Sequence, residues 1–302
     1  MRTRLSAFAA LAGIFSLPCI GQTGPVHGVR HVVIVGADGL SPDGLLHAKV
    51  PNIDRLRRSG AYTYHARGVM PTSSSPNWAS MIMGAGPEQH GVTSNDWQPD
   101  KFEIPPVCAG SGGIFPTIFG VLRQQRPQAV IGLFHDWDGF ARLMERKAAD
   151  AVERGDGPVE TMRKAVDFVK SRRPSFLFVQ LDHVDSAGHK HGYGSPEYLT
   201  AVEEADRLIG DLLRALENAR LLEESVFLVT ADHGGVGKKH GGATMAELEI
   251  PWIVTGPGVV KGRELRAPLN IYDTAATVAY IFGLKPPACW IGQPVRDAFS
   301  GK

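Results

Sequence analysis

Four short runs of β-branched and other apolar residues recur along the chain, and each is followed within two residues by an aspartate or a histidine. A run that is apolar at nearly every position indicates a strand buried on both faces, as in a parallel sheet. A fifth run has a similar composition and ends in a glycine-proline-glycine turn. In chain order, the predicted strands are His31–Ala37, Ala129–Phe134, Ser175–Leu181, Ser225–Thr230 and Ile250–Thr255.

Helical patterns separate these strands. The clearest covers Pro196–Leu222, where leucine, isoleucine and valine recur at helical spacing. Further helices are predicted over Asn52–Arg58, Pro158–Arg172 and Ile271–Phe282. Strands that alternate with helices predict an α/β fold, a doubly wound and mostly parallel sheet with helices on both faces. Ligands of such sheets bind beyond the carboxyl ends of the strands, where the polar residues stand here.

Residues 96–128 differ in character, because prolines and glycines are frequent and periodicity is weak. We interpret this segment as a small loop-rich insertion over the site, within one catalytic domain of residues 22–302. Residues 1–21 resemble a secretory signal peptide: two arginines precede an uncharged apolar stretch that ends in small residues. Because that stretch is short for a membrane span, we expect an exported protein, periplasmic or secreted, with no span in the mature chain. A lipid anchor on Cys19 is the alternative, disfavoured by Pro18 before it.

The charge of the chain disfavours nucleic acid as a partner, and its cysteines allow one disulfide in the mature protein. Lys and Arg number 32 and Asp and Glu 31, so the chain lacks the basic excess of a nucleic-acid-binding protein. Once a signal peptide is removed, Cys108 and Cys289 remain, and they could form a disulfide in an oxidising compartment. Their separation in sequence leaves that pairing open, and the oligomeric state is equally open.

Acids and histidines gather at the predicted strand ends. Three carboxylates and three imidazoles suit two divalent cations, zinc most naturally because of the nitrogen ligands. Any one of these residues alone would more commonly be a cap or a core residue, but their joint occurrence beside glycines favours a metal centre. The candidate ligands are Asp38, Asp185, His189, Asp232, His233 and His240.

A serine-rich segment, Met70–Trp78, supplies a candidate nucleophile. Pro76 suits the first turn of a helix, Ser74 or Ser75 suits its N-cap, and the helix should stop at Gly84. A hydroxyl at a helix N-terminus lies where backbone amides and the helix dipole favour anions. By itself, this pattern would indicate no more than a capping serine.

Together these motifs resemble the alkaline phosphatase superfamily, and within it the nucleotide pyrophosphatase/type I phosphodiesterase family. The resemblance extends from about His31 to Val295. The segments that carry it are Val35–Leu40, Pro71–Asn77, Asp185–His189 and Thr230–Gly234, with support from Pro51–Leu56, Gly86–Gly91 and Gly256–Val259.

The resemblance implies an alkaline phosphatase-like fold and a role for each matching residue. Ser74 would be the nucleophile, where the family usually has threonine, and Asn77 would hold a phosphate oxygen. One cation would be bound by Asp185, His189 and His240. The other would be bound by Asp38, Asp232 and His233, with the Ser74 hydroxyl as a further ligand. The implied reaction is hydrolysis of a phosphodiester or nucleotide through a covalent phosphoseryl intermediate, with the histidines neutral, so activity should fall in acid.

Other functions stay open. A phosphomonoesterase or phosphonate hydrolase shares the same metal core, and Lys238 and Lys239 could supply the extra cation that a monoester needs. A sulfatase is disfavoured because Trp78 follows Asn77 where sulfatases carry an arginine. A serine hydrolase lacks its Gly-x-Ser-x-Gly motif, and a non-catalytic metal-binding protein would require an inert Ser74.

Several aromatic and histidine residues have no assigned role. Some could stack a nucleobase or touch substrate, although each is more commonly a core or surface residue. The candidates for stacking a nucleobase are Trp78, Trp97, Trp137 and Tyr193. The candidates for touching substrate are His183 and His191. The segment His135-Asp136-Trp137 stands at a strand end and matches no motif.

Overall fold

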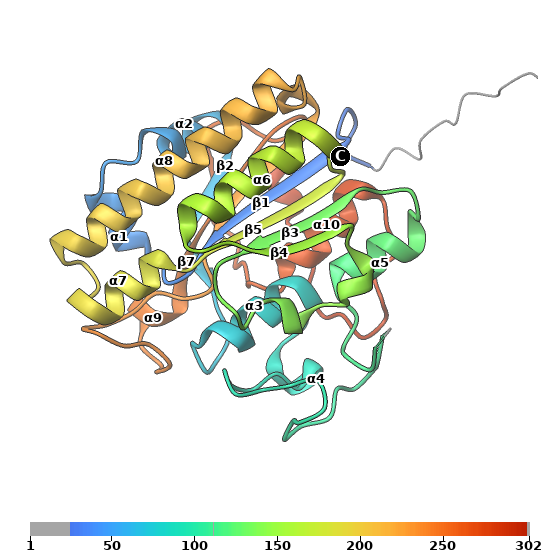
Figure 1. Cartoon of the computed structure of the whole chain (residues 1–302), viewed down its shortest axis with the longest axis horizontal. Helices are drawn as coiled ribbons and strands as arrows, with labels where there is room; N and C mark the ends of the chain where they lie inside the picture. The colour runs from blue at the N-terminus through green and yellow to red at the C-terminus, as the bar shows by residue number, and fades with distance from the viewer. Residues whose placement is uncertain (1–24, 111, 301–302) are drawn as a thin grey trace, which may run out of the picture.

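The fold is built on an eight-stranded sheet in which β1 (His31–Ala37) lies between β5 (Phe176–Leu181) and β6 (Ser225–Thr230) (Figure 1). This computed structural model describes residues 25–110 and 112–300, so the predicted signal peptide lies outside the described residues. β1 pairs in parallel with both neighbours, and every residue of these three strands is buried. Burial on both faces explains why their sequences are mostly apolar.

The sheet is mostly parallel, as predicted. Its strand order is β4-β3-β5-β1-β6-β7-β2-β8, and β7 runs antiparallel to both of its neighbours. All five predicted strands form, with ends close to the predicted ones. The remaining strands in chain order are β2 (Ala61–Arg67), β3 (Ile131–His135), β4 (Ala151–Arg154), β7 (Glu249–Thr255) and β8 (Arg263–Glu264).

Three of these strands, β2, β4 and β8, were not expected from the sequence. All three lie at or beside an edge of the sheet. In β2, buried positions alternate with partly exposed ones, and β4 and β8 are short and largely exposed. Edge strands need no continuous apolar run, so a search for such runs does not find them.

Helices cover both faces of the sheet, as predicted (Figure 1). α1, α2, α6 and α7 pack with α8, whereas α3, α5 and α10 pack with one another. The helices in chain order are α1 (Pro42–His47), α2 (Pro51–Ser59), α3 (Ser74–Met83), α4 (Pro87–His90), α5 (Ile118–Gln125), α6 (Pro158–Arg172), α7 (His183–His191), α8 (Pro196–Asn218), α9 (Met245–Leu248) and α10 (Asp273–Phe282).

Local sequence signals account for several helix ends. α8 begins where the Ser195 hydroxyl accepts the Tyr198 N–H at 3.2 Å and Pro196 occupies the first turn. α3 stops at Gly84, which adopts the left-handed conformation (φ 63°), as predicted. α8 ends at Asn218, short of the predicted Leu222.

The loop-rich segment 96–128 also contains one helix. Its last part forms α5, capped by the Thr117 hydroxyl, which accepts the Phe119 N–H at 3.2 Å. The hydrophobic face of α5 is buried and packs with α10 and α3. Prolines upstream of the helix obscured this short amphipathic pattern.

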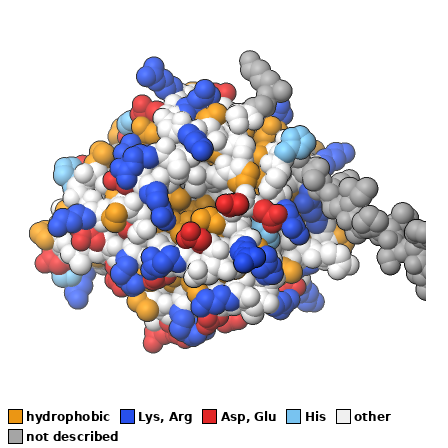
Figure 2. Space-filling model, turned by 90° about the horizontal axis from the view of Figure 1, so that it is seen from above, with side chains coloured by type: hydrophobic (Ala, Val, Ile, Leu, Met, Phe, Trp, Pro, Cys, Tyr) orange, Lys and Arg blue, Asp and Glu red, His pale blue; other side chains and the backbone are white. Residues whose placement is uncertain are grey.

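Two further features bear on the environment of the protein. Cys108 and Cys289 form a disulfide, which answers the question that the sequence left open. Within the described ranges, no helix combines the length and the apolar character needed to cross a bilayer. Acidic and basic side chains are interspersed over the face shown in Figure 2, which carries no continuous basic stripe.

Candidate active site

Six predicted acids and histidines converge at the carboxyl ends of β5, β1 and β6. Asp38 directly follows β1, Asp232 and His233 follow β6, and α7 after β5 carries Asp185 and His189. The loop after β6 returns His240 to the same place. Because these three strands are adjacent and parallel, residues far apart in sequence meet at one edge of the sheet.

Asp38, Asp232 and His233 form the inner half of this cluster, and all three are fully buried. The His233 Nε2 atom lies 3.3 Å from Asp38 Oδ1 and 3.3 Å from Asp232 Oδ2. The Gly39 N–H donates to the other oxygen of Asp232, at 3.1 Å. Asp38 Oδ1 and Asp232 Oδ2 accept no hydrogen bond from the described part of the chain, although both are buried. Two bare carboxylate oxygens thus face a shared imidazole.

Asp185, His189 and His240 form the outer half, which is more exposed. The His189 Nε2 atom lies 3.1 Å from Asp185 Oδ2 and 3.1 Å from His240 Nε2. His240 Nε2 is 3.8 Å from Asp185 Oδ1. The two halves adjoin, because Asp185 also lies within reach of Asp38 and His233.

The orientation of all three imidazoles is set by backbone carbonyls. The Nδ1 atom of His233 lies 2.8 Å from the Gly234 oxygen, that of His240 lies 2.8 Å from the Thr72 oxygen, and that of His189 lies 3.0 Å from the Lys238 oxygen. A carbonyl can only accept, so each Nδ1 carries the proton. In the neutral ring, each Nε2 therefore directs a lone pair into the cluster.

In the inner half, the neighbouring carboxylates shift the pKa of Asp232 and that of His233. Burial and the neighbouring Asp38 carboxylate raise the pKa of Asp232 well above its ordinary range. Burial disfavours a charged His233, but the Asp232 and Asp38 carboxylates outweigh it and raise its pKa to about 10. The same negative field that holds a proton on His233 would attract a metal cation in its place.

The outer half balances its own charges. The hydrogen bond to Asp185 is the largest cause that raises the pKa of His189, to about 9. Burial opposes the charge of Asp185, but its hydrogen bonds and the nearby imidazoles hold its pKa at about 2. Tyr193 also donates its hydroxyl to Asp185. Burial and the charge of His233 lower the pKa of His240.

The donor set fits divalent cations. Buried carboxylate oxygens without a donor favour a positive charge beside them. A cation that displaces the Nε2 protons would gain the imidazole nitrogens as further ligands. In each of two groups, the three ligand atoms all lie within 4.8 Å of one another. The first group comes from Asp185, His189 and His240, and the second from Asp38, Asp185 and His233. Mixed imidazole and carboxylate ligands are those that zinc accepts.

Ser74 lies at the edge of the inner half. It is the first residue of α3, a helix that is buried along its whole length, and its hydroxyl oxygen lies 3.4 Å from His233 Nε2. The N-cap of α3 is Ser73, not Ser74 or Ser75 as expected, and its side chain makes no capping hydrogen bond. The Ser74 hydroxyl is therefore free of a capping role and faces the cluster.

The Asn77 amide, which the resemblance implied for a phosphate oxygen, is hydrogen-bonded to the backbone. Its amide oxygen accepts the Val69 N–H at 2.7 Å, and its amide nitrogen donates to the carbonyls of Val69, Pro71 and Ser73. The residue is fully buried. With its donors directed at backbone carbonyls, Asn77 has none left for a phosphate oxygen. It holds the loop before α3 in place instead.

Asn95 is a candidate that the sequence analysis missed. Its amide oxygen accepts the Ser75 N–H at 2.8 Å, which places the side chain beside the start of α3. Asn95 is exposed, and its amide nitrogen makes no hydrogen bond within the described residues. No motif marks this asparagine, because it reaches α3 from a separate loop.

The aromatic candidates divide by burial. Trp78 and Trp97 are buried and cannot stack a base, whereas Trp137 and Tyr193 are partly exposed. Of the two unassigned histidines, His183 lies 3.1 Å from the Ala201 carbonyl through Nε2. His191 lies 3.9 Å from Glu197.

The lysines proposed for a monoesterase are exposed. Lys238 donates to the Lys190 carbonyl at 2.9 Å, which engages its ammonium group at the surface. Another cation lies beside the start of α3. Arg142 donates to the Ser75 hydroxyl at 3.2 Å and to the Asn95 carbonyl.

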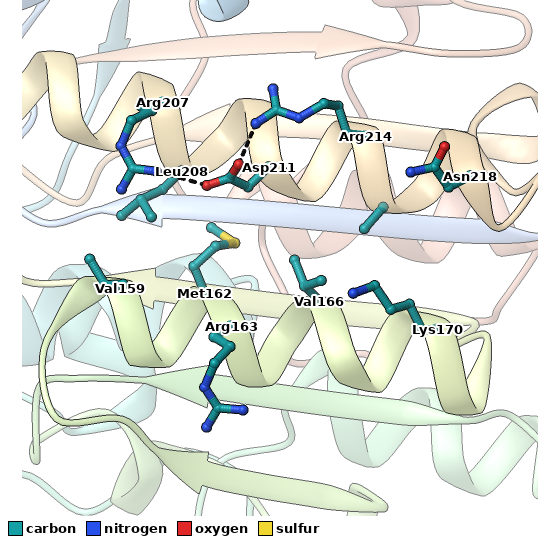
Figure 3. Close-up of a pocket in the computed structure, with 11 residues that line it drawn as sticks. Val159, Met162, Arg163, Val166, Lys170, Arg207, Leu208, Asp211, Arg214 and Asn218 are labelled. Atoms are coloured by element: carbon teal, nitrogen blue, oxygen red, sulfur yellow. Dashed lines mark hydrogen bonds and ion pairs between the residues drawn. The ribbon is translucent and has the colours of Figure 1, made fainter.

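A groove of about 360 Å³ lies apart from this cluster, between α6 and α8 (Figure 3). Its apolar floor is flanked by arginines, and Arg207 and Arg214 both bind Asp211. These cations are paired with acids on their own helices, so the groove presents no converging catalytic groups. The strand-end cluster is the candidate active site.

The family model for type I phosphodiesterase/nucleotide pyrophosphatase matches residues 32–242. Venom phosphodiesterase 2 of Crotalus adamanteus is 25% identical over 194 residues, which are 61% of this chain and 24% of that protein. Ectonucleotide pyrophosphatase/phosphodiesterase family member 1 of Mus musculus is 28% identical over 194 residues, 61% of this chain and 21% of that protein. The chain thus spans less than a quarter of the length of these curated relatives.

Solved structures share the fold. Murine ectonucleotide pyrophosphatase/phosphodiesterase 5, as an inactive variant in complex with AMP, superposes with a TM-score of 0.75 at 16% identity, covering 90% of this chain and 100% of that chain. A mutant of the alkaline phosphatase PafA superposes with a TM-score of 0.75 at 12% identity, covering 90% and 99%. The alkaline phosphatase-like fold is thereby confirmed. With more than half of its length matched by the family model, the chain belongs to the type I phosphodiesterase/nucleotide pyrophosphatase family.

Proposed function

We propose that the protein is a metal-dependent phosphodiesterase or nucleotide pyrophosphatase that acts through a covalent phosphoseryl intermediate. The observation that carries this proposal is the place of the Ser74 hydroxyl, 3.4 Å from His233 Nε2 beside two buried carboxylate oxygens that lack donors. A nucleophile at the edge of a cation-binding cluster suits displacement at phosphorus.

The two ligand sets that we propose are those that the family resemblance implies. Asp38, Asp232 and His233 would hold one cation with the Ser74 hydroxyl as a further ligand. Asp185, His189 and His240 would hold the other. We propose zinc for both, because imidazole nitrogens and carboxylate oxygens are its usual ligands. Such ions lower the pKa of a bound hydroxyl and neutralise the charge that develops on the leaving oxygen.

Each residue near the cluster has its own role in the proposed reaction. The Ser74 oxygen attacks phosphorus, so that a serine–phosphorus ester forms as the bond to the leaving oxygen breaks. Water afterwards cleaves the serine ester and regenerates the hydroxyl. The Asn95 amide nitrogen would donate to a non-bridging phosphate oxygen, because the Ser75 N–H fixes the other end of that amide. The N-terminus of α3 adds a field that favours anions.

The substrate that we propose is a phosphodiester or a nucleotide. The support is the family membership and the AMP held by the murine relative of the same fold. One observation favours a second candidate, a phosphomonoesterase: Arg142 binds the Ser75 hydroxyl beside the nucleophile, and a monoester needs such a cation.

We also propose that the protein is exported, with residues 22–302 forming one catalytic domain after loss of residues 1–21. The charged start and apolar stretch of the N-terminal sequence support export. The disulfide between Cys108 and Cys289 adds support, because such bonds persist in oxidising compartments.

The test is a paired assay of bis-p-nitrophenyl phosphate and p-nitrophenyl phosphate, on zinc-loaded protein with and without a chelator. Chelator-sensitive preference for the diester is the expected result, and Arg142→Met should leave it unchanged. Preference for the monoester, lost in Arg142→Met, would select the second candidate. Hydrolysis of neither ester, or hydrolysis that a chelator leaves intact, would contradict both.

A further inference from the structure

The two oxygens of Asp38 have opposite surroundings. Oδ2 accepts the indole N–H of Trp78 at 3.0 Å and an amide N–H of Gln180 at 3.3 Å. Oδ1 has no donor and faces His233 at 3.3 Å. All four side chains are fully buried, so water does not even out this difference.

The amide of Gln180 is held in one orientation. Its Oε1 atom accepts the Trp137 backbone N–H at 3.1 Å, so its nitrogen must point to Asp38. The Trp137 backbone is itself fixed, because His135 Nδ1 lies 2.9 Å from the Trp137 carbonyl. The neighbouring Asp136 carboxylate accepts the Asp182 N–H at 2.6 Å, which ties this turn to the end of β5.

The indole of Trp78 is held with equal firmness. It packs against Phe140 and Phe178, with ring centroids 5.4 and 6.0 Å away. Gly36 of β1 leaves the space for the ring, because a Cβ atom there would come within 2.4 Å of the indole. Glycine at this position thus lets a side chain of α3 reach the end of β1.

We propose that Trp78 and Gln180 are positioning residues for Asp38, which direct Oδ1 at the inner cation by occupying Oδ2 with two neutral donors. This inference rests on the proposed metal centre. Neutral donors fix the carboxylate without cancelling its charge, whereas an arginine would compete with the cation. The segment His135-Asp136-Trp137 thereby gains a role, because its backbone orients Gln180.

Two substitutions test the inference. Trp78→Phe removes one donor to Oδ2, and Gln180→Met removes the other donor with a side chain of similar length. Each should weaken binding of one of two Zn²⁺ ions about 10- to 100-fold, the usual cost of losing such an outer contact. Competition with a chromophoric chelator measures both affinities on the full chain. With Co²⁺ in place of zinc, the visible absorption of the weakened site should also shift.

Trp252→Phe is the matched control. Trp252 is buried, and its indole N–H donates to the Thr274 hydroxyl at 3.2 Å, not to a residue of the cluster. In urea denaturation of the metal-free chain, Trp252→Phe should lose about as much stability as Trp78→Phe does. It should nevertheless keep both zinc affinities and the cobalt spectrum of the wild type.

Three outcomes are decisive. Selective loss of one ion in both variants, with the control intact, supports the positioning role. Wild-type zinc affinities and cobalt spectra in both variants would overturn it and leave the metal centre standing. A wild-type chain that binds neither Zn²⁺ nor Co²⁺ would overturn the metal centre, and this inference with it.

Discussion

The inner and outer halves of the acid–imidazole cluster differ in how the charge of their buried carboxylates is compensated. In the outer half, Asp185 receives hydrogen bonds from Tyr193 and His189, so its charge is balanced by the chain itself. In the inner half, Asp38 and Asp232 each keep a buried oxygen without a donor. The inner half therefore has two buried carboxylate oxygens open to a cation, whereas the oxygens of Asp185 are already engaged by the chain.

Burial explains the difference. The inner residues are fully buried, whereas about half of the His189 side chain is exposed, at 47%. A charge pair in a buried site interacts more strongly and is screened less than one near water. We therefore expect the inner cation to bind more tightly and to exchange more slowly than the outer one.

The largest expected effect concerns the nucleophile beside the inner half. Ser74→Ala should lower turnover about a thousandfold or more, because it removes the proposed nucleophile, while the zinc content stays near wild type. Steady-state assays with metal analysis check both parts. Ser73→Ala, a neighbour whose side chain makes no capping hydrogen bond, should stay within about twofold of wild type. Near-native turnover of Ser74→Ala would refute the assignment.

The second prediction sets the halves against each other. Asp232→Asn should empty the inner site at micromolar zinc, because it removes a buried charge that nothing else replaces. His189→Gln should weaken only the outer ion, about 10- to 100-fold, since Asp185 and His240 remain. Elemental analysis after gel filtration counts the ions. Equal losses in the two variants would show that the halves do not differ.

The third prediction concerns exchange. Incubation of the zinc-loaded protein with a chelator should remove the ions in two phases, the fast phase belonging to the outer half. His189→Gln should lose the fast phase and keep the slow one. A single phase that releases both ions at one rate would contradict the expected order.

The smallest effect concerns an acid behind the inner half. Burial raises the pKa of Asp136 from 3.8 to about 7, although the Asp182 N–H opposes this. The unfolded chain ionises this group near pH 4 and the folded chain only near pH 7, so its contribution to stability is lost as pH rises between these values. Asp136→Asn should therefore stabilise the metal-free chain at pH 8 by about 1–2 kcal/mol and leave it unchanged below pH 4.

Urea denaturation at pH 4, 6 and 8 measures this pH dependence. The control is Asp138→Asn, which alters an exposed ion pair with Arg154 and should change stability by less than about 1 kcal/mol at any pH. A gain for Asp136→Asn that is the same at every pH would show that ionisation is not its cause.

The sequence predicts the cluster better than its surroundings, for a physical reason. Apolar runs mark the buried parallel strands, and parallel strands bring Asp38 and Asp232 to one edge of the sheet. The direction of a side chain depends on the loop around it, so the sequence could not show that the Asn77 amide is spent on backbone carbonyls. Nor could it show that Asn95 approaches α3 from another loop, because no local pattern links them.

The same limit applies to the fold. The strands β2, β4 and β8 lie near the sheet edges, where partial exposure removes the continuous apolar signal. The disulfide joins residues 181 positions apart, a pairing that depends on the finished fold. Patterns within a few neighbouring residues predicted the buried strands and the helices. Contacts between distant segments could be predicted only where adjacent parallel strands bring their ends together.

The candidate ligands, finally, are spread over about 200 residues, from Asp38 to His240, on loops that meet only when the sheet is complete. An unfolded chain cannot assemble such a set, so metallation would follow folding and would report on it. By thermodynamic linkage, each ion at a hundredfold excess over its dissociation constant would add about 2.7 kcal/mol to the stability of the fold. Under the proposed export and zinc binding, the zinc supply outside the cytoplasm would then govern lifetime as well as turnover.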